Sequence, residues 1–279
     1  MKITDNMALT FRARHFTIDL NESPKVMGII NATPDSFSDG GFVATDSLMQ
    51  AAQTQHIEGA AIVDIGAEST RPGAKEVSAD EELQRLTPLL EHLTKSLAPF
   101  PLSIDTYKTS VASAALKAGF AIVNDIWGLR QNADIAAVVA DYQAGIILMH
   151  NSRDTQHSDK IIDEILDSLK GSIGSALAAG ISEQSIMIDP GIGFGKSPSQ
   201  SLQVLKHLNR FHELGFPVLL GASRKSVIGE TLQLPVDQRL EGTLATTALA
   251  ASAKLAMVRV HDVAANVRLL KMLAAVENA

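Results

Sequence analysis

Eight short apolar runs, each followed by a pattern typical of a helix, constrain the fold of this chain more than any other feature. Continuously apolar strands separated by helices predict a parallel sheet covered on its outer face. Eight such units predict a single α/β domain, a closed (β/α)8 TIM barrel, a fold that commonly has about 250 residues. The predicted strands are residues 26–30, 61–65, 102–104, 121–123, 146–149, 186–188, 218–220 and 257–260.

The segments between the runs carry signals for helix starts and stops. Ser78 with Glu81 predicts a capping box before a helix. The apolar stripe of that helix is Leu83, Leu86, Leu90, Leu93 and Leu97. A second stripe is Ile162, Ile165, Leu169 and Ile173, and Gly59, Gly119 and Gly180 stand where helices should stop.

The amino-terminal residues differ from the rest. Residues 11–20 alternate loosely between apolar and polar, which predicts a short hairpin that plugs the floor of the barrel. No linker or low-complexity tract divides the remainder of the chain. We therefore predict an amino-terminal extension of residues 1–24 and one barrel domain of residues 25–279.

Composition narrows the class of protein. The formal charge of −7 argues against a general nucleic-acid binder, and no apolar run approaches the length of a membrane span. The chain has no cysteine, which excludes disulfides, thiolate zinc sites and a cysteine nucleophile. We expect a cytoplasmic protein that binds neither nucleic acid nor membrane.

A polar residue follows every predicted strand, at the barrel end where enzymes of this fold have their sites. These positions are Asn31, Glu68 to Arg71, Asp105, Asn124 with Asp125, His150, Asp189, Ser223 to Ser226, and Arg259 with His261. Any one of them can be explained as a helix cap or turn residue. Capping does not explain the arginines at several strand ends. It also does not explain two carboxylates at the mouth of the barrel, the opening at the carboxyl ends of the strands.

The stretch SIMIDPGIGFGK at 185–196 shows the pattern most clearly, as a buried strand, a terminal Asp189 and a glycine loop. A Walker loop requires a glycine where the chain has Pro190, and the spacing of Gly191, Gly193 and Gly195 does not fit the dinucleotide fingerprint. Both phosphate-binding motifs are therefore excluded here.

The residue types divide the mouth into two parts. One part suits an anion such as a diphosphate, because guanidinium groups match phosphate oxygens. Its residues are Arg71, Arg259, His261 and Asn31. Asp105, Asn124 and Asp189 suit a flat heterocycle rich in N–H donors. Metal binding by the two aspartates is the rival interpretation, although no spacing typical of a magnesium cage supports it.

These residues lie in segments that resemble a known family. MGIINATPDSFSDGG at 27–41 and GAESTRPG at 66–73 resemble the two long signatures of the dihydropteroate synthases, which are folate-pathway barrels. Shorter matches follow in the same order, at residues 103–106, 124–126, 223–226 and 259–262 and in the loop that opens at Asp189. The resemblance covers residue 25 to the carboxyl terminus.

The resemblance implies a transferase that condenses 6-hydroxymethyl-7,8-dihydropterin diphosphate with 4-aminobenzoate to give 7,8-dihydropteroate and diphosphate. The implied pterin contacts are Asp105, Asn124, Ile126, Met149, Asp189, Phe194 and Lys225. The implied diphosphate contacts are Asn31, Arg71, Arg259 and His261, with Mg²⁺ bridging Asn31 to the phosphate oxygens. The implied aminobenzoate contacts are Phe37, Thr70, Pro72, Lys225 and Ser226.

Catalysis is expected to depend on Asn31, Asp35, Arg71, Asp105, Lys225, Arg259 and His261. The family resemblance also implies a homodimer and a target of sulfonamides. The chain departs from the usual family pattern at Asn151-Ser152-Arg153, Tyr107 and Trp127.

Three other functions fit parts of the pattern. A methyltetrahydrofolate-dependent methyltransferase would use the pterin residues but would not need the arginines. A Schiff-base aldolase would use Lys225, but its pKa would have to be lowered. A pterin-binding protein without activity would not need the complete set of anion-binding residues.

Overall fold

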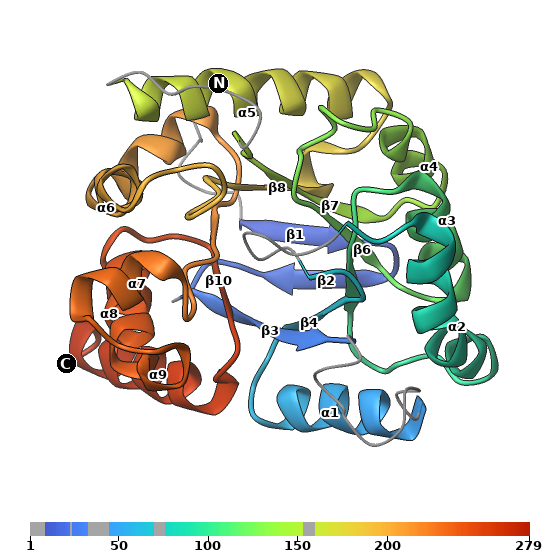
Figure 1. Cartoon of the computed structure of the whole chain (residues 1–279), viewed down its shortest axis with the longest axis horizontal. Helices are drawn as coiled ribbons and strands as arrows, with labels where there is room; N and C mark the ends of the chain where they lie inside the picture. The colour runs from blue at the N-terminus through green and yellow to red at the C-terminus, as the bar shows by residue number, and fades with distance from the viewer. Residues whose placement is uncertain (1–8, 23, 33–44, 70–75, 153–159) are drawn as a thin grey trace.

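The computed structural model describes residues 9–22, 24–32, 45–69, 76–152 and 160–279, and these contain the predicted parallel barrel (Figure 1). Its strands lie in the order β8-β7-β6-β5-β4-β3-β10-β9. An isolated parallel bridge between Ile188 and Val218 joins the two ends of this order. The strands are β3 Lys25–Asn31, β4 Ile62–Gly66, β5 Leu102–Asp105, β6 Ile122–Asp125, β7 Gly145–Met149, β8 Ile186–Asp189, β9 Leu219–Leu220 and β10 Met257–Val260.

Helices surround the strands, as the continuously apolar runs predict (Figure 1). They are α1 Thr45–Ile57, α2 Ala79–Lys95, α3 Thr109–Ala118, α4 Ile135–Asp141, α5 Ile161–Ala178, α6 Pro198–Lys206, α7 Ser226–Leu232, α8 Leu240–Ser252 and α9 Val263–Glu277. Short 3-10 helices lie at η2 Glu183–Ser185, η3 Leu208–Leu214 and η4 Val236–Gln238. None of the described helices combines the length and apolar character needed to cross a bilayer.

The helix starts and stops differ from the prediction in detail. Ser78 Oγ accepts a hydrogen bond from the Glu81 backbone N–H at 3.2 Å, so the predicted start is confirmed. A capping box also requires the Glu81 side chain to reach back to the Ser78 backbone. That part of the prediction is wrong, because the Glu81 carboxylate pairs with Arg85 at 2.5 Å. Leu97 lies beyond the end of α2 and is 63% exposed, so it is not part of the apolar stripe. A complete capping box occurs instead at Ser197, before α6.

The predicted hairpin forms between β1 Thr10–Ala13 and β2 Phe16–Asp19 and packs against the amino-terminal end of the barrel. The Phe11 ring lies so close to Gly145, at the start of β7, that a Cβ on this glycine would come within 2.6 Å of Phe11 Cζ. Phe11 shares one buried cluster with inward-facing side chains of seven strands. These side chains are Met27, Ile62, Ile122, Ile147, Met187, Leu219 and Met257.

The next layer of the barrel interior is polar. Successive side chains of a strand alternate between its two faces, so the residue two positions after an inward residue also faces inward. Two positions after Ile62 stands Asp64, and two positions after Met257 stands Arg259. The same count leads to Asn124 on β6 and Asp189 on β8. The carboxyl ends of the strands thus hold polar groups above an apolar floor.

Candidate active site at the carboxyl ends of the strands

Arg259 lies at the centre of a network that joins four strands. Its Nε donates to Asp64 Oδ2 at 2.6 Å, and its Nη2 donates to Asp105 Oδ2 at 2.6 Å. Asn124 Nδ2 donates to the same Asp64 oxygen at 3.0 Å. The structure therefore brings together three predicted residues, Arg259, Asp105 and Asn124. Asp64, which holds two of them, was not predicted as a site residue.

This network leaves acceptor atoms without partners. Among the described residues, Oδ1 of Asp64 and Oδ1 of Asp105 are buried and have no hydrogen-bond partner. Burial raises the pKa of Asp105 to about 7; Arg259 opposes this shift, and the neighbouring Asp64 carboxylate adds to it. Unpaired buried acceptors are costly unless a ligand or water satisfies them. The mouth is therefore suited to a ligand that donates several hydrogen bonds.

Asp189, Lys225 and Arg259 converge beside Gly221, directly after β9. A Cβ on Gly221 would lie 3.3 Å from Asp189 Oδ2, 3.9 Å from Lys225 Nζ and 4.0 Å from Arg259 Cβ. Lys225 Nζ donates to the Ile192 carbonyl at 2.5 Å. Burial raises the pKa of Asp189, while Lys225 opposes the shift. The glycine leaves room for a ligand to approach these charged groups.

Apolar side chains form one wall of the same region. Ile126, Met149 and Phe194 make a separate buried cluster, so the three predicted wall residues lie together. Tyr107 and Trp127, two positions where the chain departs from the family pattern, pack against this cluster. Lys225 Nζ lies 4.6 Å from the centre of the Phe194 ring. A flat ring would find both an apolar face and a cation here.

Lys196 was not predicted as a site residue and is only 7% exposed. Its Nζ donates to the Gly191 carbonyl at 2.8 Å and lies 2.9 Å from His150 Nδ1. A third contact, to the Phe194 carbonyl, is 3.4 Å. Burial lowers the pKa of Lys196 to about 7, and the nearby Asp189 carboxylate opposes this change. The side chain thus holds the glycine loop that follows Asp189.

Two of the polar strand-end residues have structural partners away from this network. Asp125 accepts hydrogen bonds from the backbone of Trp127 at 2.8 Å and of Leu129 at 2.6 Å, so it stabilises a turn. Arg224 forms a two-pronged ion pair with Asp262, at 3.0 and 2.5 Å. The interpretation as cap or turn residues is correct for Asp125.

The remaining described candidates lie around the rim. His261 Nδ1 is 3.0 Å from Ser223 Oγ, which also accepts from the His261 backbone N–H at 3.2 Å. Ser226 is exposed at the start of α7. Asn31 is half-buried at the end of β3, and its side chain makes no hydrogen bond with any described residue.

Five predicted residues, Asp35, Phe37, Thr70, Arg71 and Pro72, lie outside the described residues. The two ends of the segment that carries the last three are tied together, because Glu68 Oε1 accepts from the Val77 backbone N–H at 3.1 Å. Lys108 bridges Glu68 at 2.5 Å and the fully buried Glu82 at 2.6 Å. These ion pairs fix the end of β4 against α2 and α3.

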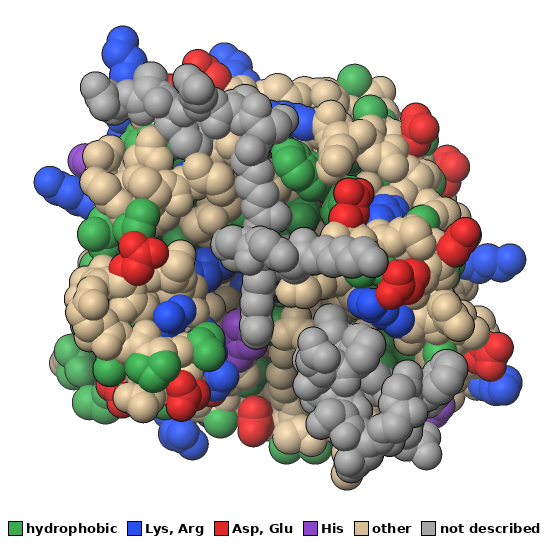
Figure 2. Space-filling view, in the orientation of Figure 1, with side chains coloured by type: hydrophobic (Ala, Val, Ile, Leu, Met, Phe, Trp, Pro, Cys, Tyr) green, Lys and Arg blue, Asp and Glu red, His purple; other side chains and the backbone are tan. Residues whose placement is uncertain are grey.

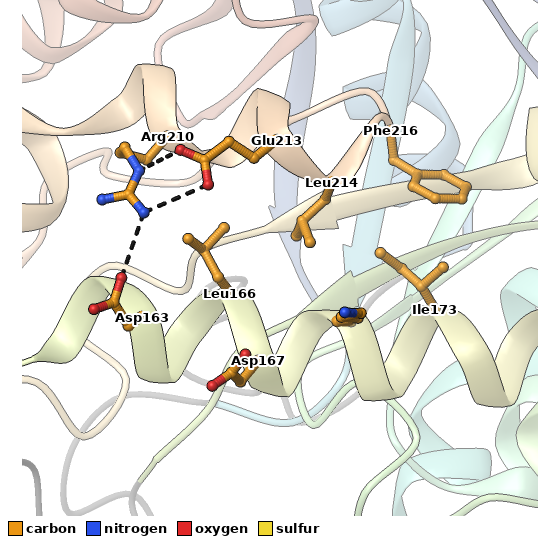
Figure 3. A pocket seen from close by; sticks show the side chains of 9 residues that line it. Asp163, Leu166, Asp167, Ile173, Arg210, Glu213, Leu214 and Phe216 are labelled. Atoms are coloured by element: carbon orange, nitrogen blue, oxygen red, sulfur yellow. Dashed lines mark hydrogen bonds and ion pairs between the residues drawn. The ribbon is translucent and has the colours of Figure 1, made fainter. Parts of the chain in front are cut away.

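A groove of about 470 Å³ lies elsewhere, on the outside of the barrel between α5 and η3 (Figure 3). Leu166, Leu214 and Phe216 line it, and Arg210 on its rim pairs with Asp163 at 3.4 Å. Both of these charged side chains are about half exposed, at 45% and 59%. The groove has no convergent buried polar groups like those at the strand ends, so we place the site at the strand ends. Across the described residues, no three His, Cys, Asp or Glu side chains lie together so as to hold a metal ion.

Comparison with known proteins agrees with this geometry. A profile of the family described as pterin binding enzyme matches residues 27–261. The dihydropteroate synthase of Bacillus subtilis (strain 168) is 46% identical over 262 residues, which are 94% of this chain and 91% of that protein.

Solved structures of dihydropteroate synthases are also similar. The Clostridium difficile protein, determined in the presence of pteroic acid, is 45% identical with a TM-score of 0.88, covering 94% of this chain and 100% of that one. The Xanthomonas albilineans protein with 4-aminobenzoic acid is 42% identical with a TM-score of 0.91, covering 98% and 100%. The Yersinia pestis protein in complex with a sulfonamide drug is 38% identical with a TM-score of 0.88, covering 97% and 100%. The chain therefore belongs to the dihydropteroate synthase family of pterin-binding enzymes.

Proposed function

We propose that the polar layer at the strand ends binds the pterin of the dihydropteroate synthase reaction. As a member of this family the chain is a transferase, which condenses 6-hydroxymethyl-7,8-dihydropterin diphosphate with 4-aminobenzoate and releases diphosphate. The observation that carries the assignment is the network of Asp64, Arg259, Asp105 and Asn124, because it gathers carboxylate and amide acceptors at the strand ends and leaves Oδ1 of Asp105 without a partner among the described residues. The pteroic acid in the Clostridium difficile structure supports the same ligand class.

The pterin half of the site uses complementary hydrogen bonds. A pterin has a ring N–H next to an exocyclic amine, and a carboxylate accepts from both in parallel. Asp189 is the proposed carboxylate, while Asp105 and the Asn124 side chain accept from other edges of the ring. Ile126, Met149 and Phe194 cover one face, and Lys225 approaches from the side of Asp189.

The diphosphate half lies toward Arg259, His261 and Asn31. The Arg259 side chain is 19% exposed, so part of it faces the mouth while its Nε and Nη2 remain paired. Asn31 offers a single amide oxygen, which suits Mg²⁺ that is held mainly by phosphate oxygens and water. Bound there, the ion would supply charge neutralisation to the diphosphate. Arg71, outside the described residues, is the proposed second guanidinium.

Catalysis then consists chiefly of stabilising the departing charge. Diphosphate is a good leaving group, and the pterin ring can delocalise the positive charge that develops as the bond breaks. Arg259 and His261 would hold the departing oxygens. An aromatic amine is neutral at pH 7 and attacks without a dedicated base. Asp35 is assigned to this step by resemblance alone.

The aminobenzoate site combines residues of the α7 start with residues outside the described ranges. Lys225 and Ser226 would bind the carboxylate of the substrate, and Phe37, Thr70 and Pro72 would contact its ring. The Xanthomonas albilineans protein was solved with 4-aminobenzoic acid and the Yersinia pestis protein with a sulfonamide drug, which supports an aminobenzoate substrate and a target of sulfonamides.

Calorimetry with the pterin diphosphate, with and without Mg²⁺, tests the assignment. We expect binding in both conditions and tighter binding with the ion, together with diphosphate release when 4-aminobenzoate is added. Turnover of methyltetrahydrofolate would favour the methyltransferase. Borohydride trapping of a carbonyl substrate on Lys225 would favour the aldolase. Binding without diphosphate release would identify a protein that has lost its chemistry.

We also propose a homodimer and a cytoplasmic location, both by family resemblance. Apolar side chains gather on the corner formed by α7 to α9 (Figure 2). Leu232, Val236 and Leu249 are each 44–48% exposed. Leu232 packs at Gly242, and Leu249 lies two turns further on the same face of α8. In the proposed homodimer a second copy covers this surface. Sedimentation tests this: the unaltered chain should sediment as a dimer and Leu249→Arg as a monomer.

A further inference from the structure

Asp64 lies one layer below the site, in the middle of β4, and is fully buried. Its Oδ2 accepts from Asn124 Nδ2 at 3.0 Å and from Arg259 Nε at 2.6 Å. The carboxylate thus contacts one proposed pterin residue and one proposed diphosphate residue. It lies beneath the two halves of the mouth and holds a side chain of each.

The Asp64 carboxylate determines which way the Asn124 amide points. An ionised carboxylate only accepts hydrogen bonds, so Asn124 must turn its NH2 group toward it. The amide oxygen then points away. Asn124 Oδ1 has no hydrogen-bond partner among the described residues, and it is not one of their fully buried unpaired atoms. It is therefore an acceptor open to the mouth.

A purely structural role explains Asp64 poorly. A buried ion pair contributes little net stability, and apolar residues of similar volume often fill such a place at least as well. Asp64 Oδ1 is also buried without a partner within the described chain, which adds a cost. The arrangement is explained if the carboxylate serves the orientation of its neighbours.

We propose that Asp64 is a positioning residue that sets the hydrogen-bond polarity of the pterin pocket, by fixing Asn124 with its carbonyl toward the ligand and Arg259 by its Nε. The inference rests on the proposed pterin role of Asn124 and deepens it. A donor-rich ring requires acceptors in the pocket, and without Asp64 the Asn124 amide is free to present its NH2 group instead.

The substitution Asp64→Leu tests this in two directions. Leucine has a similar volume but offers no acceptor, so neither Arg259 Nε nor Asn124 Nδ2 is held, and the Asn124 amide can turn its NH2 group to the mouth. We expect affinity for 6-hydroxymethylpterin, measured by calorimetry, to fall about tenfold or more. Affinity for inorganic diphosphate should hold or rise, because one carboxylate that competes for Arg259 is gone. A distorted mouth would instead weaken the binding of both ligands.

Asp64→Asn provides the rescue. Its side-chain oxygen can take the place of Oδ2 and accept from both Arg259 Nε and Asn124 Nδ2, so the Asn124 carbonyl again faces the mouth. We expect pterin affinity within about threefold of the unaltered chain. Ser103→Ala is the matched control, because Ser103 pairs with Asp64 in the sheet register and its buried hydroxyl has no described partner. It should leave both affinities within about twofold.

Each outcome decides between the proposals. Equal losses of pterin and diphosphate affinity in Asp64→Leu, or a pterin affinity in Asp64→Asn as low as in Asp64→Leu, overturn the role of Asp64 alone. If the unaltered chain binds no pterin, the proposed function fails and this inference with it. If Asp64→Leu does not fold, the comparison is between the unaltered chain and Asp64→Asn. Asp64→Asn must then keep pterin affinity within about threefold, and a larger loss overturns the proposal.

Discussion

Asp189 and Asp125 both end a buried strand and are both almost fully buried, yet their carboxylates have different partners. Asp189 accepts from the Gly191 backbone N–H through Oδ1 at 2.7 Å, while its Oδ2 borders the space beside Gly221 together with Lys225 and Arg259; both oxygens of Asp125 accept from the backbone of a turn. Asp189→Asn places a donor against pterin donors, so pterin affinity should fall by about 2–3 kcal/mol in calorimetry. Asp125→Asn is the matched control and should lower the Tm without changing the affinity. Equal affinities of the two variants would remove Asp189 from the site.

Asp105 gives the site a pH dependence whose sign follows from its raised pKa, about 7. The folded state holds its proton above the ordinary pKa of 3.8, so this group stabilises the fold at low pH, and that stability is lost as pH rises through about 7. A pterin N–H requires the ionised form as its acceptor. Pterin affinity measured by calorimetry should therefore rise between pH 6 and 8, with proton release on binding. Asp105→Asn should bind weakly and without this pH dependence; a profile unchanged in that variant would contradict the assignment.

At the scale of residues, the sequence identifies strand-end groups better than groups one layer deeper. Asp105, Asn124, Asp189 and Arg259 follow or end apolar runs, so their positions indicate the mouth. Asp64 stands inside the run 61–65, which was predicted as an apolar strand without a site residue. A carboxylate in a strand buried on both faces is the signal that would have identified it, because burial of an unpaired charge is costly.

At the scale of elements, the loop after β8 depends on Lys196. This side chain donates into the loop at the Gly191 carbonyl and reaches His150 on the neighbouring strand end. Lys196→Met removes these donors and keeps the apolar stem. We expect faster hydrogen exchange at the backbone amides of residues 191–195 and weaker pterin binding, because Phe194 loses its position. Lys206→Met, an exposed lysine of α6, is the control. Unchanged exchange in Lys196→Met would show that the glycine loop holds its shape alone.

Elements were predictable to the extent that their signals are local. All eight barrel strands lie within two residues of the apolar runs, since a run and its strand share the same buried residues. The Lys108 bridge was not predictable, because its partners Glu68 and Glu82 lie 40 and 26 residues away. The capping box at Ser197 does carry a local signal, Ser-Pro-Ser-Gln, but it directly follows the glycine loop and was not predicted.

At the scale of the whole molecule, the barrel separates the groups that stabilise it from those that bind. The floor consists of the hairpin and an apolar layer, and the polar layer lies above it at the strand ends. TIM-barrel enzymes in general have stability at the amino-terminal face and chemistry at the carboxyl face. A change at the floor should therefore alter folding without altering the ligand contacts.

Phe11→Ala tests this separation. The ring is fully buried, in contact with Gly145, and its removal leaves a cavity between the hairpin and the strands. A buried Phe→Ala change costs about 3–5 kcal/mol, so the midpoint of urea unfolding should fall by a corresponding amount. Phe16→Ala is the control, since this ring is only partly buried at the edge of the same cluster, and it should cost less. Below the unfolding transition both variants should bind 6-hydroxymethylpterin with the affinity of the unaltered chain. A loss of affinity in Phe11→Ala under those conditions would mean that the plug sets the geometry of the mouth, and the two faces of the barrel would then be coupled rather than separate.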